Sequence, residues 1–214
     1  MPYIMTHLII AKNASGVFGK HINSLPQYYL GSLAPDAVHN REGFIYDYKK
    51  TSHLLVGEEK WGTMTNHDEC KNNVIAFFLE NKQSENHDFI LGYCVHILSD
   101  IYHHKTITTP LMQKYPDKLG KLYREESTKL DIELALTYEG REDFWLNLAK
   151  ANAVDLPGII YAKEIDKQRH YIGTLYKDKD RQDISTNQII TYELNMDYIK
   201  NATDFVISNL QEYL

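Results

Sequence analysis

The segment Gly92–Thr106, "GYCVHILSDIYHHKT", constrains the fold most, because it places His96, Asp100 and His104 four residues apart in an otherwise apolar run. Apolar residues on most positions predict a buried α-helix, and i, i+4 spacing sets the three polar side chains on one face of it. Buried imidazole and carboxylate groups need a partner such as a hydrogen-bonding group or a metal ion. The segment therefore predicts a helix that carries either buried hydrogen bonds or metal ligands.

Helix geometry limits what these three residues can do together. Neighbouring members can reach one ion, but His96 and His104 lie about 12 Å apart along the axis, too far for a single ion. Asp100 would then belong with His96, and His104 would serve another ion or lie outside the site. Spacing alone slightly favours a simpler interpretation: His96 is a core histidine bonded to a carbonyl, Asp100 is a buried acceptor, and His103 and His104 form a solvated helix end.

The overall composition excludes several classes of function. The net charge of −6 and the lack of a basic block argue against non-specific binding of duplex nucleic acid. Cys70 and Cys94 do not form a CxxC pair, so any metal must be held by nitrogen and oxygen ligands. The opening "MPYIMTHLIIAK" has no basic start, and its apolar run is too short to cross a bilayer. These features predict a cytoplasmic protein without a transmembrane segment.

Helical periodicity is clearest in residues 74–79, 89–101, 119–136 and 192–214, and we expect one all-α domain that spans residues 1–214. Segments rich in glycine, proline and polar residues predict breaks at 32–39, 43–51, 81–87, 108–117 and 154–158. Asp183–Ser185 are the expected cap of the last helix.

Three further residues of metal-ligand type lie beside hydrophobic positions: His7 in "THLIIAK", Asp36 in "YLGSLAPDAVH" and His53 in "SHLL". Each alone is more often structural. Together with "GYCVHILSD", and in this order, these motifs resemble the zinc-dependent phospholipase C family, whose fold is shared by single-strand-specific zinc nucleases. The resemblance runs from about Tyr3 to Ala135. The order His, Pro-Asp, His, HxxxD is moderately specific, whereas HxxxD alone is weak.

The resemblance implies an all-α fold around a zinc cluster that hydrolyses phosphate esters. His7 would bind one ion, Asp36, His53 and His96 would bind a second, and Asp100 would bridge the two. A water shared by the ions would attack phosphorus, with Asp36 as the catalytic residue that accepts its proton. Another first-row divalent metal would suit the same ligands. The expected substrate is a small phosphate ester or a phospholipid head group.

The sequence also departs from the family. The family's mature enzymes begin with a tryptophan that binds zinc, whereas this chain begins Met1-Pro2. A later family histidine falls where this chain has Thr106, and a His-xxx-Glu pair is replaced by Ser127 and Asp131. Only His104 and Asp131 remain as candidates for a third ion. Read by itself, the segment 125–136 is first an amphipathic helix with solvated acids.

Two other functions stay open. The dipeptides His67-Asp68 and His87-Asp88 invite comparison with the His-Asp phosphohydrolases, but both lie in polar segments where we expect them to cap helix starts. A non-catalytic helical binding or scaffold module with a structural metal is the third interpretation. The missing outer ligands favour it, and the complete inner set argues against it.

Overall fold

The computed structural model describes residues 3–57, 63–116 and 119–214. Within these ranges the regular structure is helical, apart from an isolated antiparallel bridge between Leu156 and Ile160, so the all-α prediction is confirmed. The α-helices are α1 (Ile4–Phe18), α2 (Leu25–Gly31), α3 (Tyr46–Ser52), α4 (His67–Asn81), α5 (His87–His103), α6 (Thr109–Lys114), α7 (Leu119–Thr137), α8 (Arg141–Lys150), α9 (Ala162–Leu175) and α10 (Tyr192–Leu210). Short 3₁₀ segments are η1 (Gly19–His21), η2 (Ala34–Asn40) and η4 (Gln211–Tyr213), and a π-helical turn, η3 (His104–Thr108), follows α5.

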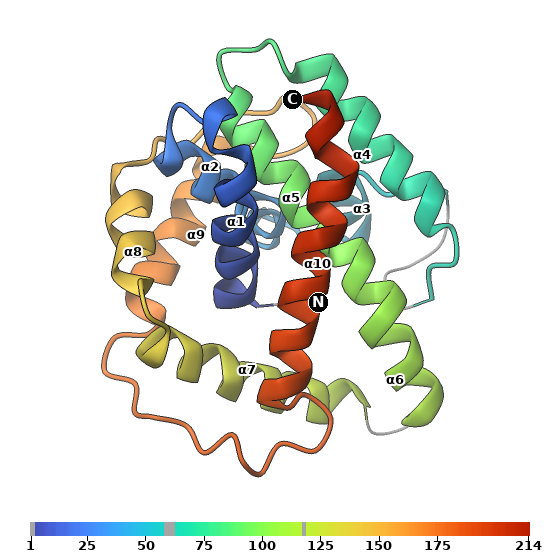
Figure 1. Ribbon diagram of the computed structural model, residues 1–214, viewed down its shortest axis with the longest axis vertical. Coiled ribbons are helices and arrows are strands. Elements are labelled where there is room, and N and C mark those ends of the chain that lie inside the picture. Colours follow the sequence, from blue (N-terminus) through green and yellow to red (C-terminus); the bar gives the residue numbers. More distant parts are fainter. Residues whose placement is uncertain (1–2, 58–62, 117–118) are drawn as a thin grey trace.

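Helix α5 is the centre of the molecule, and every residue in it except His87 and Tyr102 is buried. A helix that is apolar on all sides has to be covered on all sides. Helices α1, α2, α4 and α10 pack against α5, while α8 packs on α2 and α7 packs on α1 (Figure 1). The face that carries His96 and Asp100 is therefore enclosed by the surrounding helices.

Two glycines let α2 approach α5 at backbone distance. A Cβ atom on Gly31 would lie 2.0 Å from the carbonyl oxygen of Phe89, and one on Gly92 would lie 2.0 Å from that of Tyr28. Any side chain at these positions would force the helices apart. The close crossing brings the residue after α2, Ser32, against the middle of α5.

Three of the segments with clear periodicity lie in α4, α5 and α7, as predicted, and the fourth, 192–214, forms α10 and then the 3₁₀ turn η4. Two expected breaks instead contain helices: α3 lies within the region 43–51 and extends to Ser52, and α6 begins inside 108–117 with Pro110 in its first turn. Proline fits a first helical turn because the N–H that it lacks has no partner there. The expected cap of α10 is also corrected, since Thr191 caps the helix by accepting a hydrogen bond from the Leu194 N–H.

Among the described residues, no helix is both long enough and apolar enough to cross a membrane.

Candidate metal centre

Five side chains converge at the middle of α5 from four elements. His7 comes from α1, Asp36 from η2, His53 from the residue that ends α3, and His96 and Asp100 from α5. Their ligand atoms form two groups within 4.8 Å: His7 with His96 and Asp100, and Asp36 with His53 and His96. The structure thus brings together the five residues that the sequence motifs singled out, and His96 belongs to both groups.

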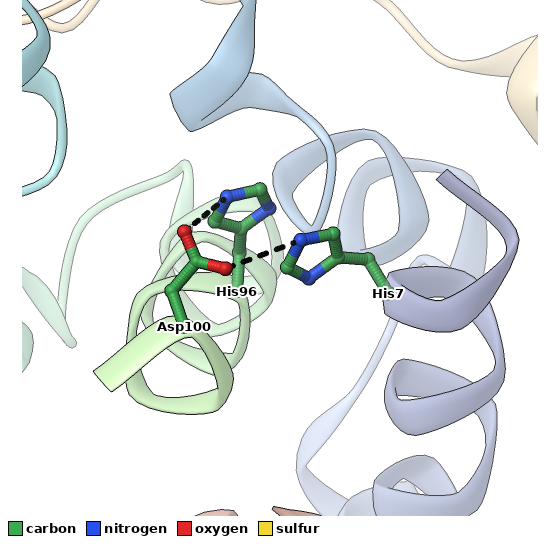
Figure 2. A group of neighbouring side chains, drawn as sticks. All are labelled: His7, His96 and Asp100. Atoms are coloured by element: carbon green, nitrogen blue, oxygen red, sulfur yellow. Dashed lines mark ion pairs between the residues drawn. The ribbon is translucent and has the colours of Figure 1, made fainter. Parts of the chain in front are cut away.

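Asp100 lies between the histidines and presents one oxygen to each side. Its Oδ1 lies 3.5 Å from His7 Nε2, while its Oδ2 lies 3.6 Å from His96 Nε2 and 3.5 Å from His53 Nε2. Figure 2 shows the carboxylate facing His96 and His7 along the two dashed lines. This is the arrangement that a carboxylate needs to bridge two ions.

Asp36 completes the second group and is its most accessible member. Its Oδ1 lies 3.3 Å from His53 Nε2, and its Oδ2 lies 3.9 Å from His96 Nε2. The Asp36 side chain is 22% exposed, whereas those of His53 and Asp100 are fully buried. The cluster therefore meets solvent at Asp36.

Hydrogen bonds to the outer ring nitrogens orient two of the histidines. Ser99 Oγ–H donates to the carbonyl oxygen of His96, so the Ser99 oxygen accepts from His7 Nδ1 at 3.2 Å. His96 Nδ1 donates to the carbonyl oxygen of Ser32 at 2.8 Å. With a proton fixed on each Nδ1, both Nε2 atoms point a lone pair into the cluster.

His53 is held in the same way by the residue before it. Ser52 Oγ donates to the carbonyl oxygen of Lys49 and lies 2.9 Å from His53 Nδ1, which donates to it. All three histidines thus present Nε2 inward, which is the usual second-shell arrangement around metal-binding imidazoles.

Buried polar atoms in the cluster have no hydrogen-bond partner among the described residues: His7 Nε2, His96 Nε2 and both carboxylate oxygens of Asp100. Such atoms are rare in folded proteins, and a set of four that face one another indicates a site for a cation. Two ligands of a tetrahedral zinc ion, each about 2.0–2.1 Å from it, lie about 3.3 Å apart. Most separations in the cluster are close to this value, so the residues fit zinc.

The protonation states also suit a metal. Burial, and then the neighbouring His96, lower the pKa of His7 to about 3, and burial lowers the pKa of His96. Burial raises the pKa of the Asp100 carboxyl, but His53, His96 and His7 outweigh this effect and leave it below its usual range. At neutral pH the rings of His7 and His96 are therefore neutral and Asp100 is ionised, the forms that bind metal.

The pKa of Asp36 is also low. Burial acts to raise it, but the Lys49 ammonium, followed by the neighbouring His53 and His96, keeps the pKa of this carboxyl well below its usual range. Lys49 Nζ lies 3.3 Å from Asp36 Oδ1. Lys49 was not a candidate from the sequence, where nothing distinguishes it from a surface lysine.

His104 and Asp131, the candidates for a third ion, lie outside both groups. His104 is buried, and its Nδ1 lies 2.9 Å from His67 Nε2. Asp131 accepts hydrogen bonds from the Met5 N–H at 2.8 Å and from the Tyr176 hydroxyl at 2.6 Å. Asp131 therefore stabilises the first turn of α1, the helix that carries His7.

The two His-Asp dipeptides do not cap their own helices. His67 contacts His104, and Asp68 is exposed and pairs with Lys71. Asp88 is buried and accepts hydrogen bonds from the N–H groups of Asn23 and Ser24, just before α2. The expectation that these carboxylates cap α4 and α5 was wrong; Asp88 instead supports the helix that leads to Ser32.

Sequence reasoning missed the supporting serines Ser32, Ser52 and Ser99. Ser52 and Ser99 had a local signal, because one precedes His53 directly and the other lies three residues after His96. Ser32 acts through its backbone carbonyl, which carries no sequence signal. The zinc-binding chain end of the family falls on Met1 and Pro2, which lie outside the described residues.

Comparison with known proteins agrees with this geometry. No curated protein and no solved structure matches the chain significantly. The family described as zinc dependent phospholipase C matches residues 6–211, which include all five residues of the cluster and nearly the whole chain. The chain belongs to the zinc-dependent phospholipase C family.

Proposed function

We propose that this protein is a zinc-dependent phosphodiesterase whose metal ligands are His7, Asp36, His53, His96 and Asp100. The observation that carries the proposal is the set of buried, inward-facing atoms of His7, His96 and Asp100 that have no hydrogen-bond partner among the described residues. A metal site of this composition, in a chain of this family, supports hydrolysis of phosphate esters.

Each ligand has a distinct part in this proposal. His7 Nε2 and Asp100 Oδ1 would hold one ion, and His53, His96 and Asp36 would hold the other. Asp100 Oδ2 faces the second group, so Asp100 would bridge the pair. Bound zinc supplies a water of lowered pKa and positive charge for the phosphoryl oxygens.

Asp36 is the residue that would meet the substrate. It lines a cleft of about 520 Å³. Its low pKa keeps the carboxylate ionised at neutral pH, so it can orient a water molecule and accept its proton. Lys49, beside it, adds a positive charge at the same opening.

Access from the cleft favours catalysis over a purely structural metal. Structural zinc sites are closed, whereas catalytic sites keep a position open. The partial exposure of Asp36 supports an open site. The His-Asp phosphohydrolase alternative has less support, because Asp68 is exposed, and His67 and Asp131 contact other residues.

The test combines metal content with hydrolysis. Protein purified without nickel or chelator is expected to contain zinc and to hydrolyse bis(p-nitrophenyl) phosphate, with activity lost in chelator and restored by zinc. Asp100→Asn keeps the size of the side chain but removes the charge between the ions, so it should abolish both metal content and activity.

Asp204→Asn is the matched control, since it is the same change at an exposed position of α10 whose carboxylate pairs with Lys200. It should keep both properties. A zinc-loaded wild-type protein without chelator-sensitive hydrolysis of this ester, of phospholipids or of single-stranded nucleic acid would overturn the proposal in favour of a scaffold with a structural metal.

A further inference from the structure

The cleft over the metal centre is bounded by residues from η2, α3, α7 and α9. It reaches the cluster at Asp36, the one partly exposed ligand. In the proposed reaction, a substrate whose phosphorus lies at the cluster would place its polar head group in this cleft. The charges of the cleft therefore bear on which head groups fit.

Two basic side chains line the cleft, Lys49 from α3 and Arg124 from α7. Lys49 is only 5% exposed, and its ammonium is held 3.3 Å from Asp36 Oδ1 and 3.4 Å from His39 Nε2. Arg124 is exposed, and its Nε donates to the carbonyl oxygen of Gly120 at 3.0 Å. One cation is thus fixed next to the metal centre, and the other lies at the solvent side.

The described residues that line the cleft offer no matching negative charge for a cationic head group. Among the described residues that line the cleft, the sole carboxylate is Asp36, which belongs to the metal centre and already pairs with Lys49. The tyrosines of the wall, Tyr3, Tyr46, Tyr123 and Tyr171, can attract an ammonium through their ring faces. Full charges act over a longer range than ring quadrupoles. The two cations therefore determine the sign of the electrostatic potential in the cleft.

We propose that this cleft selects phosphodiesters whose head group is neutral or anionic over zwitterionic esters of the choline or ethanolamine type. The selection rests on the proposed phosphodiesterase function of the same site. Lys49 and Arg124 attract the additional negative charge of the head group and repel an ammonium in its place.

The experiment uses three soluble esters that release the same p-nitrophenol: the p-nitrophenyl esters of phosphocholine, phosphoglycerol and phosphoglycolate. For the zinc-loaded protein, kcat/KM should rise in this order, with phosphoglycolate ahead of phosphocholine by about 10-fold or more. The preference should shrink as salt concentration rises, because exposed charges are screened.

Arg124 provides the specific variants, since it lines the cleft without contacting the metal ligands. Arg124→Gln should lower kcat/KM for the phosphoglycolate ester by about 10-fold, mainly through KM, and should raise kcat/KM for the phosphocholine ester, because the repulsion of its ammonium is lost. Arg124→Glu should bring the two esters level or reverse their order. Lys121→Gln is the control, because Lys121 lies on the same helix, is exposed and pairs with Glu125 outside the cleft lining.

The outcomes separate the two proposals. Equal or better hydrolysis of the phosphocholine ester, unaffected by Arg124→Glu, would overturn charge selection and leave the phosphodiesterase function standing. If zinc-loaded protein hydrolyses none of the esters, the proposed function fails. Calorimetric titration with phosphoglycolate and phosphocholine then still tests whether the cleft prefers the anionic ligand. Tighter binding of phosphoglycolate, weakened by Arg124→Glu, would support it, and equal binding would overturn it.

Discussion

His7 and His96 stack face to face, with ring centroids 3.8 Å apart and ring planes 9° from parallel. Two imidazolium ions would repel each other in this arrangement, so the stack requires that at least one ring is neutral. The rings are held by different partners, Ser99 for His7 and the Ser32 carbonyl for His96, and each faces a different oxygen of Asp100. The stacked rings therefore lie beside Asp100, at the place where the two groups of ligand atoms meet.

His96 should matter more for metal content than His7, because its Nε2 belongs to both groups of ligand atoms. We expect His7→Ala to lower the zinc content to about half, and His96→Ala or Asp100→Ala to remove nearly all of it. Inductively coupled plasma mass spectrometry after dialysis against metal-free buffer measures the content. Wild-type zinc levels in the His96 and Asp100 variants would contradict this assignment.

Ser99→Ala should weaken zinc binding without unfolding α5, since alanine is the best helix former. The change removes the oxygen that accepts the proton of His7 Nδ1, so the ring loses its fixed orientation. We expect zinc affinity to fall by about 10–100-fold, the usual effect of losing such a partner, as measured by competition with a chromogenic chelator.

Ser208→Ala is the control for this variant. Ser208 Oγ bonds to the carbonyl oxygen of Phe205, three residues earlier in α10, as Ser99 Oγ does to that of His96 in α5. If both variants lose affinity equally, the effect of Ser99 is a general one on helix stability.

Helices α5, α7 and α10 could be predicted because their apolar residues repeat at helical spacing over three or more turns, as in residues 89–101, and the shorter run 74–79 predicted α4. The short helices α3 and α6 could not. Their segments begin near Gly43 or contain Pro110, which indicate a break, yet α3 packs against η2 and Pro110 fits the first turn of α6. The π-helical turn after His103 has no sequence signal either.

The five ligand residues could be proposed from the sequence because each has a metal-binding side chain within an apolar stretch and their order matches a family pattern. Their partners could not. Which carbonyl orients His96 depends on how closely α2 crosses α5 at Gly31 and Gly92, and the place of Lys49 depends on the turn between η2 and α3. Such contacts between distant segments are set by packing.

The stability of the metal-free protein should fall as the pH drops from 7 to 5. His7 has a folded pKa of about 3 against 6.5 for an exposed histidine, so the unfolded state binds more protons in this range. By linkage, the lowered pKa of His7 alone reduces the free energy of unfolding by about 2 kcal/mol at pH 5. His96 and His103, whose pKa values are also lowered by burial, act in the same direction.

Asp131 opposes this trend, since its raised pKa makes the folded state bind more protons. The histidines with lowered pKa values outnumber Asp131, so the free energy of unfolding still increases as the pH rises. Urea unfolding of chelator-treated protein at several pH values measures the slope, and His7→Gln should flatten it by up to one proton. A free energy of unfolding that is flat or rises toward pH 5 would contradict the lowered pKa values.

Asp131→Asn should raise the free energy of unfolding at pH 7.5 and leave the zinc content unchanged. Burial raises the pKa of Asp131 to about 6, against the hydrogen bonds from Tyr176 and the Met5 N–H. A carboxyl with a raised folded pKa adds stability below its unfolded pKa of 3.8, and this is lost as the pH rises through 6.

At pH 7.5 the buried charge therefore costs about 1–3 kcal/mol, which an uncharged amide avoids. The asparagine oxygen can still accept from Met5, and the Tyr176 hydroxyl can accept from the amide. The stability gain over the wild type should shrink toward zero at pH 4. If Asp131 only stabilises the start of α1, the zinc content of Asp131→Asn equals that of the wild type. Loss of zinc in this variant would instead indicate that Asp131 is a ligand of a third ion.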